Sequence, residues 1–138
     1  MFPAALRSVV AGGQVTKATV MAQAMTEMIR NDPFDTLVSR YNGFDSRTLS
    51  VTCPFSSSLF DANAIKKKWK CDLLATEAQL TGRGLPDAYG TSSVSCLNAD
   101  GTAGACGSTD LRRVTVTVAW GRGGSRFVSL VTYVARTQ

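Results

Sequence analysis

The hydrophobic residues near the N-terminus repeat with the period of an α-helix. They follow i, i+3, i+4 and i+7 spacing, at Ala18, Met21, Ala22, Met25, Met28 and Ile29. This spacing places them on one face, so we predict an α-helix from Phe2 to Arg30. Pro33 lacks a backbone N–H and keeps Asp32 out of the α region, so the helix is expected to end just before this pair.

A helix of this length is long for the chain. About thirty residues at about 1.5 Å each form a rod of about 45 Å, whereas a compact domain of this size has a radius of gyration near ~14 Å. The helix must therefore cross the whole domain or project beyond it. Gly12 and Gly13 cost about 1 kcal/mol each relative to alanine, so they mark a candidate kink or a frayed entry. The alternative is an ordinary N-terminal core helix.

The segment after this helix is predicted to be a connector followed by a short strand. The connector runs from Pro33 to Arg47 and contains the turn dipeptide Asn42-Gly43. Tyr41 and Phe44 are expected to pack against the helix and not to contact a ligand. Apolar and polar residues then alternate over 49–53, and this period of two predicts a half-buried strand.

A second helix is expected in the middle of the chain. Ser58 or Asp61 is its predicted cap, and Gly82 is its predicted stop after about Leu80. Its apolar stripe consists of Ile65, Trp69, Leu73 and Leu80. Cys71 lies on another face of this helix, so we expect neighbours on two sides and a cysteine within reach of a strand.

The clearest strand pattern lies at the C-terminal end. A short strand is predicted around 92–96, and two longer alternating runs cover 114–120 and 126–136. The glycine-rich segment 121–125 between these runs is typical of a hairpin loop, so the two strands should pair antiparallel. One face is expected to pack on a helix while a Thr/Ser face meets solvent. The predicted class is α+β, with a long N-terminal helix on an antiparallel sheet.

Length and composition limit the organisation of the chain. The 138 residues, 44% of them hydrophobic, are enough for one globular domain over 1–138, with the helix in 2–31 and the remaining helices, loops and sheet in 32–138. Fifteen Lys and Arg against ten Asp and Glu give a formal charge of +5, which permits an anionic partner without requiring one. The sequence has no apolar run of about 18 residues that would span a membrane and no signal-peptide pattern.

The chain has four cysteines and no histidine. Among the three possible pairings we favour Cys96 with Cys106, because the small residues of 97–105 form a loop that gains from closure. By elimination this leaves Cys53 with Cys71. Two disulfides indicate an oxidising compartment. A Cys₄ zinc site is the alternative, which the lack of any C-x-x-C pair makes less favoured.

Several classes of enzyme are excluded. Without histidine, Ser-His-Asp and Cys-His arrangements and nitrogen-ligand metal sites cannot form. Asp32 and Asp35 are close in sequence, but they flank Pro33, so capping and turn formation explain them better than acid–base catalysis. The segment 121–126 is glycine-rich but lacks the phosphate-binding pattern G-x-x-x-x-G-K-[ST]. We predict a protein that is not an enzyme and uses no cofactor.

A lysine cluster supports an alternative binding function. Lys66, Lys67, Lys68 and Lys70 surround Trp69 within one and a half helical turns. Such a patch could bind DNA or another anionic surface. We favour an ordinary solvated helix face, because Trp69 belongs to the apolar stripe and no second aromatic residue interleaves with the lysines as a stacking platform.

Three parts of the sequence carry a resemblance to a known family. They are the helix segment 21–33, the pair Trp69 and Leu73 followed by Leu85-Pro86, and the terminal strands 114–120 and 128–132. In this order they resemble the soluble part of type IV pilin-like proteins, closest to PilV-type minor pilins and the related minor pseudopilins of type II secretion. The family's leader peptide, its cleavage site and its apolar N-terminal half-helix with a glutamate have no counterpart in this sequence.

The resemblance implies a structural, filament-forming function. It implies a minor subunit at or near the tip of a type IV pilus or a secretion pseudopilus, which primes assembly with other minor and major pilins or pseudopilins. It also implies an upstream apolar half-helix anchored in the bacterial inner membrane, with Met1 to Leu6 as its remnant. The expected location is the inner membrane, the periplasm and the extracellular filament.

The first half of the N-terminal helix is the predicted contact surface for sister subunits. Leu6, Val9 and Val10 precede Gly13, where too little chain lies nearby to cover them. Exposed contiguous apolar area usually marks a contact site. Related subunits are therefore the favoured partners, and nucleic acid is the less favoured one.

Overall fold

The structure is a computed structural model that describes residues 2–53, 62–77, 85, 87–121 and 125–136, without the side chains of 2–13, 62–63 and 75–77. The described residues form the α-helices α1 (Phe2–Arg30), α2 (Leu37–Tyr41) and α3 (Ala62–Glu77), and the 3-10 helices η1 (Phe34–Thr36) and η2 (Ser46–Thr48). They also form the strands β1 (Phe44–Asp45), β2 (Tyr89–Leu97), β3 (Leu111–Trp120) and β4 (Arg126–Ala135).

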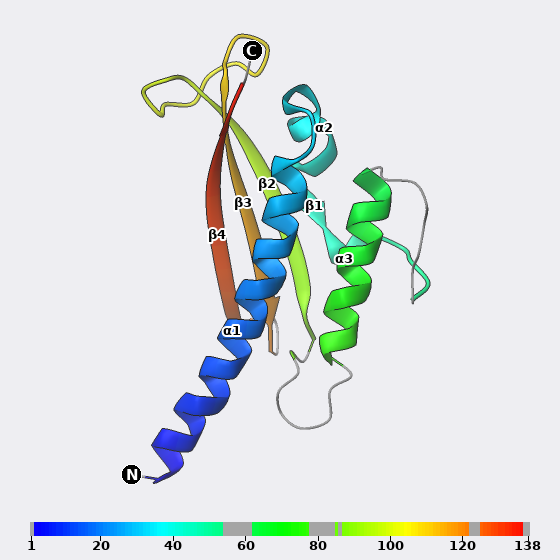
Figure 1. Cartoon of the computed structure of the whole chain (residues 1–138), viewed down its shortest axis with the longest axis vertical. Helices are drawn as coiled ribbons and strands as arrows, with labels where there is room; N and C mark the ends of the chain where they lie inside the picture. Colours follow the sequence, from blue (N-terminus) through cyan, green and yellow to red (C-terminus); the bar gives the residue numbers. More distant parts are fainter. Residues whose placement is uncertain (1, 54–61, 78–84, 86, 122–124, 137–138) are drawn as a thin grey trace.

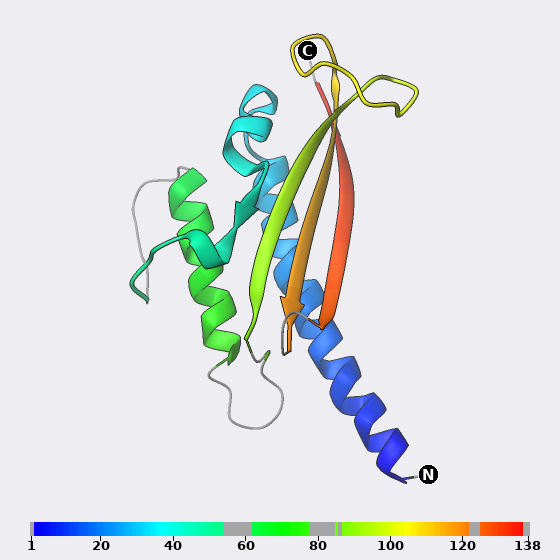
Figure 2. The same cartoon turned by 180° about the vertical axis from the view of Figure 1, so that it is seen from behind.

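The four strands form one antiparallel sheet in the order β1-β2-β3-β4. α1 crosses one face of this sheet, and α3 stands beside α1 toward β1 (Figure 1). The view from behind shows that no described helix covers the opposite face (Figure 2). The expected α+β class with an antiparallel sheet and a C-terminal hairpin is therefore confirmed.

The inner face of the sheet is made by alternate residues of the long strands. Val114, Val116 and Val118 of β3 are fully buried, and they stand opposite Thr132, Leu130 and Val128 of β4. The outer face carries the expected Thr and Ser residues, with the Thr117 and Ser129 hydroxyls 2.7 Å apart. It also carries exposed apolar side chains, Phe127, Val131 and Tyr133, so its β4 edge is less polar than predicted.

α1 packs its small and apolar side chains on this valine face. Ala18, Ala22 and Ile29 are completely buried and Met25 nearly so. Met28 was expected in the same stripe but is 42% exposed. Each residue rotates about 100° around the helix axis, so Met28 lies roughly 100° away from Ile29 and leaves the contact. The helix continues through Gly12 and Gly13, so the predicted fray at this pair is wrong.

α3 joins the core through its predicted stripe. Trp69 and Leu73 are buried, and Ile65 packs against them. The Trp69 indole N–H donates to the Met21 carbonyl of α1 at 2.9 Å, and its ring lies directly over Gly90 of β2. The proposed cap and stop of this helix, Ser58 or Asp61 and Leu80 to Gly82, lie outside the described residues.

In the connector, Tyr41 is fully buried and Phe44 packs against the core. The Phe44 ring lies 6.2 Å from the Trp69 ring, centroid to centroid. β2 is longer than the predicted 92–96 strand and begins at Tyr89. The Asn42 side chain binds β2 to the connector, because its oxygen accepts from the Val94 N–H at 3.1 Å.

The strand predicted over 49–53 is wrong. The chain leaves the sheet at Asp45, whose side chain accepts from the Arg47 N–H and begins η2. Residues 49–53 then have no regular secondary structure. Lys70 of α3 donates to the Leu49 carbonyl, and Cys53 is bonded to Cys71. The segment is therefore held on α3 by a side chain and a disulfide, not by a neighbouring strand.

The close approach of Trp69 to Gly90 makes a testable prediction for folding. A Cβ at position 90 would lie 2.0 Å from the Trp69 ring, so Gly90→Ala should destabilise the domain by about 1–3 kcal/mol through overpacking. Gly107→Ala is the matched control, since its Cβ would meet no atom within 4 Å. Urea unfolding of both variants measures this, and equal midpoints would contradict the Trp69–Gly90 contact.

Candidate functional site

α1 has two regions with different surroundings. Its C-terminal part lies on the sheet and has buried side chains from Gln14 to Ile29, and its N-terminal part extends past the ends of the strands (Figures 1 and 2). The predicted contact residues Leu6, Val9 and Val10 belong to the extending half, and their side chains lie outside the described residues. On the packed half, Val15 is 45% and Val20 56% exposed, so this half also has exposed apolar side chains.

The helix is attached to the hairpin where it leaves the sheet. The Gln14 side-chain oxygen accepts from the Trp120 indole N–H at 3.3 Å and from the Arg126 guanidinium at 3.1 Å. Beside these contacts is an open hollow of about 330 Å³ lined by Val15, Trp120, Ser125, Arg126 and Phe127. Its lining is mostly apolar, and Arg126 is the one charged side chain among the described residues that line it. A catalytic pocket needs several converging polar groups, so this hollow is a poor candidate for one.

The lysine cluster is divided among different neighbours. Lys66 lies over the rings of Tyr41 and Phe44, with its ammonium 5.5 and 5.3 Å from their centroids. Burial, followed by the nearby Arg40, lowers the pKa of Lys66. Lys70 donates to the Leu49 carbonyl. Lys67 is half-buried and Lys68 is exposed, so the four ammonium groups do not present one uniform anion-binding surface.

Both expected disulfides are present. Cys53 is bonded to Cys71 and Cys96 to Cys106. The first bond ties the irregular segment after η2 to α3. The second closes residues 97–105 into a loop at the end of β2, where the Gly104 N–H also donates to the Cys96 carbonyl at 3.0 Å.

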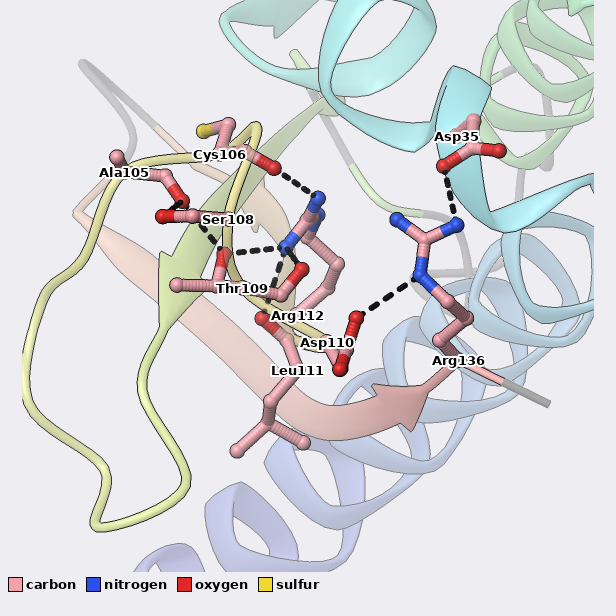
Figure 3. A network of polar contacts seen from close by, with 9 residues as sticks. All are labelled: Asp35, Ala105, Cys106, Ser108, Thr109, Asp110, Leu111, Arg112 and Arg136. Atoms are coloured by element: carbon pink, nitrogen blue, oxygen red, sulfur yellow. Dashed lines mark hydrogen bonds and ion pairs between the residues drawn. The ribbon is translucent and has the colours of Figure 1, made fainter. Parts of the chain in front are cut away.

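Arg112 forms a buried polar centre at this end of the sheet (Figure 3). It is only 3% exposed and donates to the carbonyls of Cys106, at 2.8 Å, and of Thr109 and Leu111, both at 3.2 Å. Its guanidinium also lies 4.3 Å from the Phe34 ring centroid. Burial lowers the pKa of Arg112, followed in importance by repulsion from Arg136. Its Nε is the buried side-chain atom that lacks a partner among the described residues.

Asp32 and Asp35, the two carboxylates that flank Pro33, form separate ion pairs. Asp32 accepts from the Tyr41 hydroxyl and lies 3.3 Å from Arg40, while Asp35 lies 2.8 Å from Arg136. Burial and the hydrogen bond to Asp32 raise the pKa of Tyr41. These contacts tie the helix-exit connector to α2 and to the end of β4. In the described part of the chain, no cluster of three or more His, Cys, Asp or Glu side chains could hold a metal ion.

The pattern in the sequence could have located Arg112 but not its partners. It stands two residues before Val114 in the same alternating run, and residues two apart share a face of a strand. Its acceptors lie between Cys106, where the second disulfide ends, and Leu111, where β3 begins. Folding of this segment decides where they lie.

Comparisons with known proteins add no further assignment. No family model, no curated protein and no solved structure matches the chain. Among the described residues, no helix is long and apolar enough to cross a membrane.

The position of Lys66 predicts a structural contribution. Lys66→Ala should destabilise the domain by about 1 kcal/mol, because its side chain packs over two aromatic rings. Lys68→Ala, on the exposed side of the same helix, should change stability by less than about 0.5 kcal/mol. Urea denaturation followed by tryptophan fluorescence compares the two variants. If Lys66→Ala is as stable as Lys68→Ala, the ring contacts contribute nothing.

The Arg112 contacts predict a larger effect. Arg112→Lys keeps the positive charge but loses the forked donors, so it should destabilise by about 2–3 kcal/mol. Arg113→Lys is the matched control because Arg113 is exposed on the outer face, and its effect should stay below about 0.5 kcal/mol. Thermal unfolding of the oxidised protein measures both. Equal melting temperatures would show that the carbonyl contacts do not stabilise the loop.

Proposed function

We propose that this protein is the soluble part of a minor pilin or minor pseudopilin. In this role it is a non-catalytic subunit that joins related subunits at or near the tip of a type IV pilus or type II secretion pseudopilus and primes filament assembly. The proposal rests on the ordered resemblance of its helix, its mid-chain tryptophan segment and its terminal strands to that family.

The geometry of α1 is the observation that carries the proposal. One half of the helix is attached to the sheet by Ala18, Ala22 and Ile29, and the other half extends past the strands. A helix supported in this way can insert its free half among the helices of sister subunits while the sheet remains outside the bundle. Val20 adds exposed apolar area on the supported half.

Partners and location follow from the same proposal. Related minor and major subunits are the partners, and an upstream apolar half-helix would hold the protein in the inner membrane before assembly. The two disulfides support an oxidising compartment such as the periplasm. A DNA-binding function is less well supported, because Lys66 and Lys70 are engaged by their own chain.

The proposal predicts that charge on α1 blocks assembly without unfolding the domain. Val9→Asp, Val10→Asp and Val20→Asp in the full-length gene should each abolish pilus or pseudopilus formation in cells, because a carboxylate in a helix bundle is left unpaired. Circular dichroism of the soluble variants should remain that of the unmodified domain.

Gln23→Asp is the matched control for these variants. Gln23 is exposed and polar on the same helix, so this variant should assemble. Normal filaments from all three valine variants would rule out the helix as the assembly surface. Unfolding of the Val9 and Val10 variants would instead make the extending half a core element.

A further inference from the structure

The two long edges of the sheet differ in how their backbone groups are bonded. On the β2 side, β1 pairs with the middle of the strand. Side chains of the connector satisfy further groups, with Asn42 accepting from the Val94 N–H at 3.1 Å and Ser46 accepting from the Gly90 N–H at 2.9 Å. This edge is therefore closed by the protein's own chain.

The opposite edge is the outer side of β4, and it is open. β4 ends the strand order, and no strand among the described residues pairs with its outer side. In both views this side of β4 has no helix or strand running alongside it (Figures 1 and 2). An open edge of ten residues is a template for another strand.

The hydrogen-bond pattern shows which residues face this open edge. The Arg136 N–H donates to the Asp110 carbonyl at 2.8 Å, and this pair continues the register that sets Leu111 opposite Ala135. In an antiparallel ladder, opposite residues alternate between pairs that exchange both hydrogen bonds and pairs that exchange none. Even-numbered residues of β4 therefore bond to β3, and odd-numbered residues direct their N–H and C=O outward. The close Thr117–Ser129 hydroxyl contact fits a non-hydrogen-bonded pair.

The outward-facing residues carry none of the usual protection against strand pairing. Residues 127–135 contain no charged residue, proline or glycine, and the register runs through them without a bulge. Charged residues, prolines and bulges are the features that commonly prevent natural edge strands from pairing. The same odd-numbered positions include exposed apolar side chains, with Phe127 at 66%, Val131 at 52% and Tyr133 at 56%.

We propose that β4 pairs antiparallel with β4 of a second copy of this chain, joining two sheets into one across a two-fold axis. Odd-numbered residues must face odd-numbered residues, because only these have free backbone groups. With the axis at Leu130, Phe127 stands opposite Tyr133 of the second copy and Ser129 opposite its Val131, and symmetry repeats both pairs. These four pairs exchange about eight hydrogen bonds.

Charge and side-chain pairing favour this register over its neighbours. With the axis at Val131, Arg126 stands opposite Arg136 of the second copy, and like charges in that position are destabilising. With the axis at Ser129, Phe127 no longer meets Tyr133. Only the Leu130-centred register combines two aromatic pairs, which are favourable across strands, with no opposed charges. The strand is thus complementary to itself, and this dimer does not depend on the proposed filament function.

Sedimentation equilibrium of the full chain tests the dimer. The unmodified protein should form a dimer, and Val131→Lys should raise its dissociation constant by at least about tenfold, because symmetry places two new charges beside the axis. Val20→Lys is the matched control, since it makes the same substitution at a similarly exposed valine of α1. It should dimerise like the unmodified protein. Circular dichroism checks that both variants fold.

Amide hydrogen exchange at two protein concentrations tests the register independently. At high concentration the N–H groups of Phe127, Ser129, Val131 and Tyr133 should exchange more slowly, while those of the even-numbered residues should be slow at both concentrations. A protein that stays monomeric at about millimolar concentration would overturn the proposal. So would a dimer that Val20→Lys dissociates and Val131→Lys does not, since that contact would lie on α1.

Discussion

Burial of one face of α1 against the valines of β3 is the interaction on which the rest of the structure depends. Ala18 and Ala22 are small enough to let the helix lie close to the sheet, and both belong to the same buried core as Val116. Each fully buried valine contributes about 1.5–3 kcal/mol. α3 then joins this pair of layers, because the Trp69 indole donates to an α1 carbonyl and its ring rests on Gly90.

This arrangement leaves two surfaces with different chemistry. α1 offers apolar side chains such as Val20 and a half that extends past the sheet, so its contacts depend on side-chain packing. The β4 edge offers backbone N–H and C=O groups from Phe127 to Ala135, so its contacts depend on hydrogen bonds in a fixed register. Because the two modes use different atoms, substitutions that affect one surface should leave the other intact.

Local patterns were sufficient for most of the fold. Side chains that repeat every 3.6 or two residues must share a face, so periodicity located α1, the stripe of α3 and the C-terminal hairpin. Pro33 marked the end of α1 for a local reason, its missing backbone donor. The cysteine pairing could also be predicted from the sequence, because the small-residue loop before Cys106 favours a bond to Cys96. Cys53 and Cys71 then remain as the second pair.

The tertiary structure decided what local patterns could not. Alternation over 49–53 could not reveal that Lys70 and a disulfide, and not a strand, would hold that segment. The lysines looked like one patch in the sequence, yet Lys66 lies over aromatic rings brought from the connector. Arg112 could be assigned to the core face by its spacing from the valines, but not to its carbonyl partners. In each case spacing determines which face a residue occupies, whereas its contacts depend on distant segments that only folding brings together.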